Sequence, residues 1–321
     1  MPTMEKEWFN PVSLLKPELQ RLMGHITDGL SPVIQKAILT SKIRIISDDI
    51  PDRLIPPVAN LITKEIILQD IYLSFLWCCS YATVAFNNMY YEKAMQDRDT
   101  VTFKDRDELS KVNLTLLWAR SLTEKATHWP DEAARPDRPD QWTDGATNLF
   151  QACVAYILFH EIGHLLLHIG LVDVLVPGSK LSKKNVKRVH DAEKEADEFA
   201  LLRLIANSTL DDVLLIKYLG VALAHLSNFY LLREADTRGD AKHPDLDNRL
   251  CSVIKHVKLN READQIQFQA HLSVGLQLFL QLSGKRVIPK NPADAKFADF
   301  ASLEKYLFAL IAQFKKTSTD R

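Results

Sequence analysis

Cysteine is scarce in this chain of 321 residues, which has only Cys78, Cys79, Cys153 and Cys251. No two of them form a C-x-x-C pair, so neither a zinc knuckle nor a disulfide framework is predicted. A charge imbalance is also missing, because the formal net charge is −1. The composition as a whole therefore points neither to nucleic acid nor to an anionic membrane as a partner.

A clear membrane-spanning run is missing as well. The longest apolar run, from Ile71 to Phe86, is shorter than the ~20 residues that a spanning helix needs. The stretch from Val213 to Leu232 is long enough, but it carries Lys217, His225 and Asn228. Residues 1–7 have neither a basic start nor an apolar run, so no secretory signal is predicted. We expect a cytoplasmic protein in which these stretches are core helices.

What is present is mainly helical patterning. Residues 42–46 alternate and are rich in β-branched side chains, which makes them the best strand candidate. We therefore expect a mainly α fold with at most a small sheet. The expected helices cover residues 58–95, 105–123, 147–169, 190–204, 213–234, 244–257, 264–283 and 301–315.

Residues 127–146 interrupt this pattern, because they are polar and rich in proline. Loops of this length are often lids or interaction segments, and a solvated linker would explain the composition equally well. The predicted organisation is an N-terminal helical region over 1–126, this loop, and a region over 147–321 that carries the motifs described next. We expect these parts to form one continuous globular unit.

The central motif is His160-Glu161-Ile162-Gly163-His164, which reads H-E-x-x-H. On a helix His160 and His164 lie one turn apart on one face, with β-carbons about 6 Å apart. Two imidazoles at that spacing can hold one tetrahedral zinc ion. Glu161 then lies beside the metal without binding it, and it can take a proton from water.

The surrounding run from Leu149 to Ile169 predicts a buried helix, which Thr147 or Asn148 can cap and Gly170 can end. By composition, H-E-x-x-H occurs by chance in on the order of one such chain in fifty. A buried helix with two hydrogen-bonded histidines is therefore the alternative. His168 would point away from a metal held by the first two histidines, so we expect it to support a ligand or to lie on the helix surface.

A third zinc ligand is needed, and Glu193 is the candidate. It begins Glu193-Lys194-Glu195-Ala196-Asp197, where Glu193 and Asp197 share one face of a helix. Asp197 can then accept the N–H of a ligating histidine and fix its tautomer. The small residues Ala192, Ala196 and Ala200 would allow close approach to Gly163. Glu195 is the rival carboxylate and is expected to point elsewhere, and an exposed acidic helix start remains the alternative.

The third element is the stretch from His243-Pro244 to Arg249. A histidine brought into the cleft can stabilise the oxyanion that forms when water attacks a carbonyl. Arg249 could anchor a ligand carboxylate through a charged hydrogen bond. The alternative is a capped surface helix with an ordinary histidine and arginine.

In this order, H-E-x-x-H, E-x-x-A-D and H-P-x-x-x-x-R, the motifs resemble the minimal gluzincin metallopeptidases, including the HtpX-like and CAAX-prenyl endopeptidases. The length and the missing spans make the chain most similar to the phage-exclusion Lit peptidases of bacteria. The resemblance implies a zincin-like core with zinc on His160, His164 and Glu193. It also implies a base at Glu161, an oxyanion partner at His243, and supporting roles for Asp197 and, less directly, Arg249.

The predicted function is therefore that of a zinc-dependent endopeptidase acting on a protein or peptide. Resemblance to the Lit family implies phage defence by cleavage of elongation factor Tu. Two other classes remain open. One is a regulatory protein whose zinc site acts on a single partner, and the other is a structural zinc site whose fourth ligand could be His190.

Overall fold

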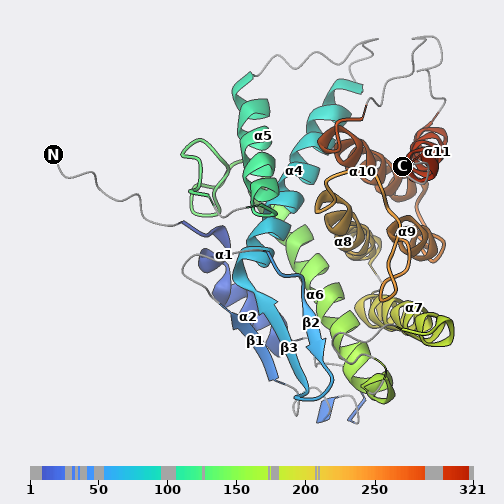
Figure 1. Ribbon diagram of the computed structural model, residues 1–321. Coiled ribbons are helices and arrows are strands. Elements are labelled where there is room, and N and C mark those ends of the chain that lie inside the picture. Colours follow the sequence, from blue (N-terminus) through green and yellow to red (C-terminus); the bar gives the residue numbers. More distant parts are fainter. Residues whose placement is uncertain are drawn as a thin grey trace. The chain divides into compact units, whose positions relative to one another are not determined.

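The computed structural model describes two compact units, formed by residues 1–58 with 65–151 and by residues 59–64 with 152–321. Within these units, the residues described are 9–25, 31–32, 35–36, 42–46, 54–94, 106–124, 127–172, 174, 181–206, 208, 210–285 and 299–317. The described chain is mainly helical with one small sheet, as predicted (Figure 1).

The sheet has three strands in the order β1-β3-β2. The predicted strand is confirmed as β1, Lys42–Ile46, which pairs in parallel with β3, Glu65–Gln69, in the register Lys42 to Glu65 (Figure 1). The third strand is β2, Val58–Asn60. The expected helix over 58–95 is therefore wrong in its first part, since the helix α4 covers only Asp70–Ala94.

A side-chain turn explains this correction. The Asn60 Oδ1 atom accepts hydrogen bonds from the backbone N–H groups of Ile62 and Thr63, which competes with helix formation. Lys64 follows with a φ of 54°, a left-handed conformation that a helix cannot contain. The chain reverses there and enters β3, whose Ile66 and Leu68 are buried.

The first unit also contains α1, Pro11–Leu14, α2, Lys16–His25, and α5, Arg106–Ser121. Helix α5 agrees with the helix expected over 105–123. The segment after it is packed rather than solvated: Trp129 is buried with its ring 4.4 Å from that of Trp118, and the Ala134 N–H donates to Thr115 Oγ1. A lid role for residues 127–146 stays a prediction.

The H-E-x-x-H helix is α6, Thr143–Leu167, so both of its expected ends are wrong. It begins before Thr147 because Asp140 and Thr143 bond reciprocally: the Asp140 N–H donates to Thr143 Oγ1, which donates to Asp140 Oδ1. It ends before Gly170, which lies in the 3₁₀ turn η1, Ile169–Leu171. The boundary between the two units falls within α6, after Gln151.

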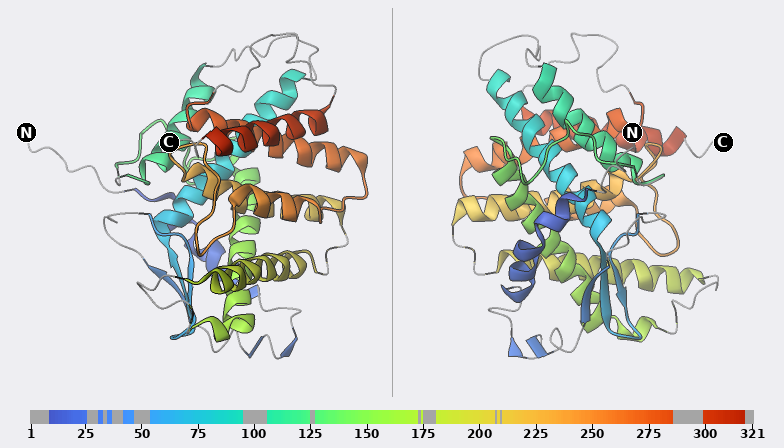
Figure 2. Two further views of the ribbon diagram at one scale, coloured as in Figure 1. Left: turned by 45° about the vertical axis from the view of Figure 1, so that its right-hand side comes forward. Right: turned by 90° about the vertical axis from the view of Figure 1, so that its left-hand side faces the viewer.

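The second unit contains residues 59–64, which belong to β2 and its turn, the part of α6 after Gln151, and five further described helices. They are α7, Lys183–Ile205; α8, Asp211–Tyr230; α9, Leu246–Ile254; α10, Glu262–Leu282; and α11, Phe300–Thr317. Helix α10 packs on both α8 and α11, while α9 packs on α7 and α8 (Figure 2). Helix α7 begins seven residues earlier than expected, because Ser182 Oγ accepts from the Asn185 N–H as its N-cap.

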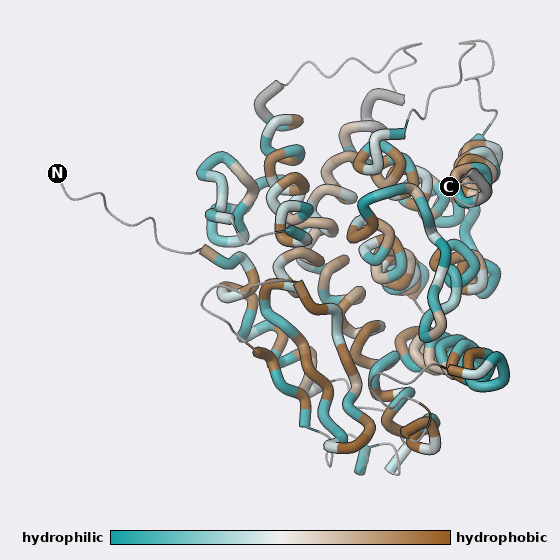
Figure 3. Tube along the Cα trace, viewed as in Figure 1, coloured by the Kyte–Doolittle hydropathy of each residue, from teal (hydrophilic) through white to brown (hydrophobic). Residues whose placement is uncertain are grey.

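Helices α6 and α8 are long and apolar enough to cross a membrane, judged by length and composition alone. Their most apolar windows are 67% and 72% buried inside the protein, so both behave as core helices of their units. Figure 3 shows the contrast with α7, whose trace alternates between hydrophilic and hydrophobic residues. The polar side chains on α6, α7 and α8 that are nevertheless buried form the site.

Candidate metal centre

Two helices of the second unit bring the site together, because α6 and α7 approach closely at Gly163. A β-carbon built on Gly163 would lie 3.4 Å from the Ala196 Cα atom and 3.2 Å from the Phe199 ring. Ala192, Ala196 and Ala200 are all buried. The expected contact between the small-residue face of α7 and Gly163 is therefore confirmed. It places Glu193 opposite the two motif histidines.

His160, His164 and Glu193 form a group whose ligand atoms all lie within 4.8 Å of one another. The two histidine Nε2 atoms are 3.1 Å apart. The Glu193 carboxylate lies 3.3 Å from His164 Nε2 and 3.7 Å from His160 Nε2. His160 and Glu193 are each 9% exposed. The structure thus assembles the three residues that were predicted to bind zinc.

The donor set fits a zinc ion. Two imidazole nitrogens that face each other at hydrogen-bond distance cannot both be neutral acceptors without a shared proton or cation. A cation between them and the carboxylate satisfies all three groups, and two histidines with one glutamate are a known ligand set of catalytic zinc. The buried His160 Nδ1 atom also has no aligned hydrogen bond, although Asp197 Oδ1 lies 2.9 Å away.

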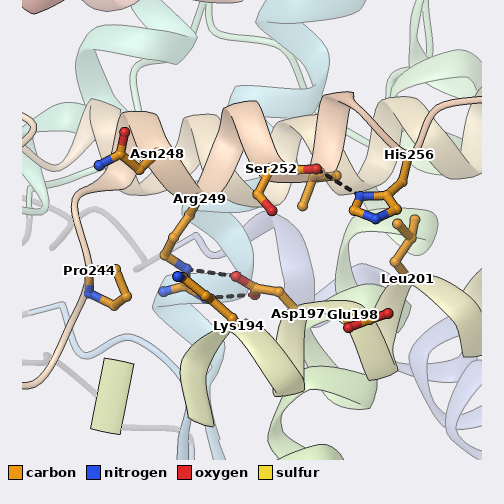
Figure 4. A pocket seen from close by; sticks show the side chains of 10 residues that line it. Lys194, Asp197, Glu198, Leu201, Pro244, Asn248, Arg249, Ser252 and His256 are labelled. Carbon is orange, nitrogen blue, oxygen red and sulfur yellow. Dashed lines mark hydrogen bonds and ion pairs between the residues drawn. The ribbon is translucent and has the colours of Figure 1, made fainter. Parts of the chain in front are cut away.

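Asp197 lies behind His160, as predicted, at the centre of a buried ionic network. The Arg249 guanidinium donates from Nε to Asp197 Oδ2 at 2.8 Å and from Nη2 to Oδ1 at 2.7 Å (Figure 4). Its Nη1 atom lies 2.9 Å from Glu193 Oε2. Arg249 therefore holds a candidate ligand and its supporting carboxylate together. Because its guanidinium is occupied in this way, the structure gives no support to the hypothesis that it anchors a substrate carboxylate.

The charges in this network lower the pKa values of two carboxyl groups, which is the direction that binding a cation needs. Burial alone would raise the pKa of Glu193, but hydrogen bonding to His164 and the charge of Arg249 lower it to about 2. Burial opposes ionisation of Asp197 too, yet the Arg249 charge holds the pKa of this carboxyl well below its usual range. Both carboxylates are therefore ionised near neutral pH.

Sequence reasoning missed two members of the network, Tyr156 and His225. The Tyr156 hydroxyl donates to Asp197 Oδ1 at 3.0 Å and lies 3.0 Å from His225 Nε2. Burial lowers the pKa of His225 to about 4, so its ring is neutral at neutral pH. Spacing could have identified Tyr156, which precedes His160 by one helical turn. His225 stood out only as a polar residue in an apolar stretch.

His168 does not belong to the metal group, in agreement with expectation, but it contacts that group. Its Nδ1 atom lies 3.0 Å from His164 Nδ1, and its Nε2 atom lies 3.1 Å from Glu195 Oε2. Glu195, the rival carboxylate, thus points to His168 rather than to the metal group. Burial lowers the pKa of His168, which favours its neutral form.

Glu161, the predicted base, is buried with 8% of its surface exposed. Among the residues that the structure describes, none makes a hydrogen bond or an ion pair with its carboxylate. Glu193 and Asp197, by contrast, are each held by several cationic or hydrogen-bonding groups. Among the three buried carboxylates described on α6 and α7, Glu161 is therefore the one whose oxygens are left for a water molecule.

His243 is placed in an exposed turn before α9. Its side chain bonds through Nδ1 to Asp240 at 3.2 Å, and it is not part of the three-residue metal group. The turn is tight: the Asp240 N–H donates to the His243 carbonyl, and a β-carbon on Gly239 would collide with that oxygen at 2.0 Å. His190 lies 2.9 Å through Nε2 from the Asp240 carbonyl, so it is tied to the same turn.

A cavity of about 200 Å³ lies between α7 and α9 beside the ion pair of Arg249 and Asp197 (Figure 4). Its other lining residues are Lys194, Glu198, Leu201, Pro244, Asn248, Ser252, Val253 and His256. The His256 ring is fixed by a contact from Nδ1 to the Ser252 carbonyl at 2.8 Å. The cavity shows that Arg249 and Asp197 are bordered by space on this side.

Comparison with known proteins agrees with this geometry. The model of the Peptidase U49 family matches residues 66–270, which is more than half of the chain and includes every residue of the metal group. The cell death peptidase of Escherichia coli (strain K12) is 25% identical over 150 residues, which cover 45% of this chain and 46% of that protein. No solved structure matches. The resemblance to the Lit peptidases is confirmed: the chain belongs to the Peptidase U49 family.

Proposed function

We propose that the chain is a zinc-dependent endopeptidase that hydrolyses a peptide bond of a protein substrate. The observation that carries the proposal is the buried group of His160, His164 and Glu193 with the open carboxylate of Glu161 next to it. Family membership supports the peptidase class. Zinc is the metal we propose, because two imidazoles and one carboxylate are ligands that it prefers.

Each residue then has a stated task. His160, His164 and Glu193 would hold the zinc ion, which, when bound, supplies a Lewis acid that lowers the pKa of water toward ~7. Glu161 accepts the proton of the attacking water and passes it to the leaving amine. Asp197 and Arg249 keep His160 and Glu193 in place. His243 remains our candidate for stabilising the oxyanion, from the exposed turn before α9.

A purely structural zinc site receives less support. His190 was the candidate for a fourth protein ligand, but its Nε2 atom contacts the Asp240 carbonyl. Within the described part of the chain, the metal group holds three residues only. A position that no protein group fills is typical of catalytic rather than structural zinc. A regulatory protein would act on a single partner and leave unfolded casein intact, whereas a general peptidase would cleave casein. An assay on unfolded casein therefore separates the two classes.

The substrate, the biological role and the cellular site are proposed from family resemblance. The E. coli relative is named a cell death peptidase, and the chain spans less than half of the length of that protein in the match. We propose that this chain likewise cleaves a protein of its own cell during phage infection. Elongation factor Tu is the first substrate to test, and the cytoplasm is the expected location.

The test compares the wild-type chain with Glu161→Gln. Both proteins are expected to bind one zinc ion, whereas hydrolysis of elongation factor Tu should fall by about 10²- to 10⁴-fold in the variant, because a proton acceptor is lost. Zinc content is measured by elemental analysis and cleavage by mass spectrometry of the products. Glu262→Gln, which changes an exposed carboxylate of the same unit on α10, away from the metal group, is the control. Retained turnover in Glu161→Gln would remove Glu161 as the base.

A further inference from the structure

The two histidines of the metal group are supported differently on their Nδ1 sides. His160 Nδ1 faces the buried carboxylate of Asp197 at 2.9 Å. His164 Nδ1 faces another ring, that of His168, at 3.0 Å, and the far nitrogen of His168 reaches Glu195 Oε2 at 3.1 Å. His168 is 6% exposed, whereas the Glu195 side chain is 64% exposed. The second support therefore runs from the buried site to the protein surface.

Hydrogen-bond donors and acceptors fix the order of protons along this line. If His164 uses Nε2 as a ligand, its proton must sit on Nδ1, which then acts as a donor. In the part of the chain that the structure describes, His168 Nδ1 is the acceptor within reach, so it must be the unprotonated nitrogen of its ring. A neutral His168 then carries its proton on Nε2, where Glu195 can accept it. All four ring nitrogens and the carboxylate are satisfied by this single arrangement.

The backbone holds His168 where this contact requires it. Its N–H donates to the His164 carbonyl at 3.1 Å, and its own carbonyl accepts from the Leu171 N–H at 2.8 Å. His168 thus lies between the last turn of α6 and the 3₁₀ turn η1, with φ −116° and ψ 18°. As the residue four positions after His164, His168 lies over the same face as the end of α6, and this brings the two rings together.

We propose that His168 and Glu195 are positioning residues for the metal centre, in which His168 fixes the tautomer and ring orientation of His164 and Glu195 fixes those of His168. This proposal rests on the proposed zinc site and deepens it. Outer partners of ligating histidines usually contribute about 10- to 100-fold to metal affinity. His168 contacts a candidate ligand directly and should contribute within this range, while the exposed Glu195 should contribute less.

The experiment measures the zinc dissociation constant by competition with a chromophoric chelator. His168→Leu removes the acceptor and should weaken zinc binding by about 10- to 100-fold. His168→Asn can present its amide oxygen where Nδ1 lay and should restore most of the affinity. Glu195→Ala should give a loss of several-fold. His271→Leu is the matched control, since it removes another buried histidine of the same unit, whose Nδ1 atom bonds to the Gln267 carbonyl and which lies outside the metal group.

A spectroscopic readout separates positioning from general stability. In the zinc-loaded wild-type chain, ring-nitrogen NMR should show His168 as the Nε2–H tautomer, and the Nδ1–H tautomer would overturn the proposal. Equal zinc affinity in wild type and His168→Leu would overturn it too, while leaving the zinc peptidase intact. If His168→Leu does not fold, Glu195→Ala decides in the same way. A wild-type chain that binds no zinc would overturn the proposal together with the proposed function.

Discussion

Each unit of this protein contains a cluster of polar side chains around one aspartate, and the two clusters differ in how fully they are paired. In the first unit, Asp140 accepts from the Tyr81 hydroxyl at 2.6 Å, the Lys111 ammonium at 3.1 Å and the Thr143 hydroxyl at 3.0 Å. The backbone N–H of Trp142 adds a fourth donor. Donors and acceptors balance, so the cluster needs nothing from outside the chain.

In the second unit, Asp197 is surrounded in a similar way, by Arg249, Tyr156 and His160. Donors and acceptors do not balance next to this aspartate, where the Nε2 atoms of His160 and His164 face each other beside Glu193. A buried group without a complementary partner is costly unless a ligand completes it. The functional cluster is therefore distinguished by the ligand atoms that its hydrogen bonds and ion pairs leave unsatisfied, rather than by burial or charge.

The largest expected effect is on zinc affinity, which should depend on the cluster of the second unit and not on the cluster around Asp140. Glu193→Ala removes a ligand and should weaken zinc binding by at least about 100-fold, beyond the usual contribution of outer partners. Asp140→Ala should leave zinc affinity unchanged and lower the free energy of unfolding by about 1–3 kcal/mol, because its donors lose their acceptor. Chelator competition and urea denaturation measure the two quantities. A loss of zinc in Asp140→Ala would contradict the distinction.

A pH experiment tests His271, a buried histidine of the second unit that lies outside the metal group. Burial lowers the pKa of His271 to about 4, and its Nδ1 atom bonds to the Gln267 carbonyl. The unfolded chain takes up a proton on this histidine below pH ~6.5, whereas the folded chain does so only near pH 4. Because the unfolded chain binds this proton first, the free energy of unfolding should fall by about 3 kcal/mol as the pH is lowered from 6.5 to 4.

In His271→Gln this part of the pH dependence should disappear, with or without zinc, because the residue lies outside the metal group. Urea denaturation of both proteins across that pH range measures the difference between their slopes. Parallel curves for wild type and variant would show that His271 is not the buried neutral base that its surroundings imply.

The smallest expected effect compares two tyrosines that make the same bond. The Tyr81 hydroxyl donates to Asp140, and the Tyr156 hydroxyl donates to Asp197. Replacing either with phenylalanine should lower the free energy of unfolding by about 1.5–3 kcal/mol, the usual contribution of a hydrogen bond to a charged group. Only Tyr156→Phe should also weaken zinc binding, by less than the ~10-fold expected for direct outer partners. Equal zinc affinity in the two variants would place Tyr156 among purely structural groups.

The metal group could be predicted because its spacing is local. Helical periodicity places His160 over His164 and Glu193 over Asp197, and the small side chains of Gly163 and Ala196 indicate that the two helices approach closely. Each inference needs only a few residues of one helix. The strand at 42–46 was predictable for the same reason, since its alternation is a local pattern.

The errors arose where a side chain or a distant partner decided the outcome. The Asn60 side chain bonds the backbone that would have continued a helix, and Asp140 with Thr143 starts α6 earlier than its apolar run suggests. His225 reaches the site from α8 through Tyr156, a pairing of residues 69 positions apart. The contact between His168 and Glu195 joins residues 27 positions apart, which periodicity within one helix does not predict.

Gly163 is one of the two unspecified positions of the H-E-x-x-H motif, and in this chain the surroundings of that position favour a small residue. A methyl group there would require the Phe199 ring to shift by a few tenths of an ångström and would touch Ala196, and both residues belong to the helix that supplies Glu193. The size of one side chain thus sets the distance between the two halves of the ligand set. A larger residue at position 163 would therefore press on α7, the helix that carries the third candidate ligand.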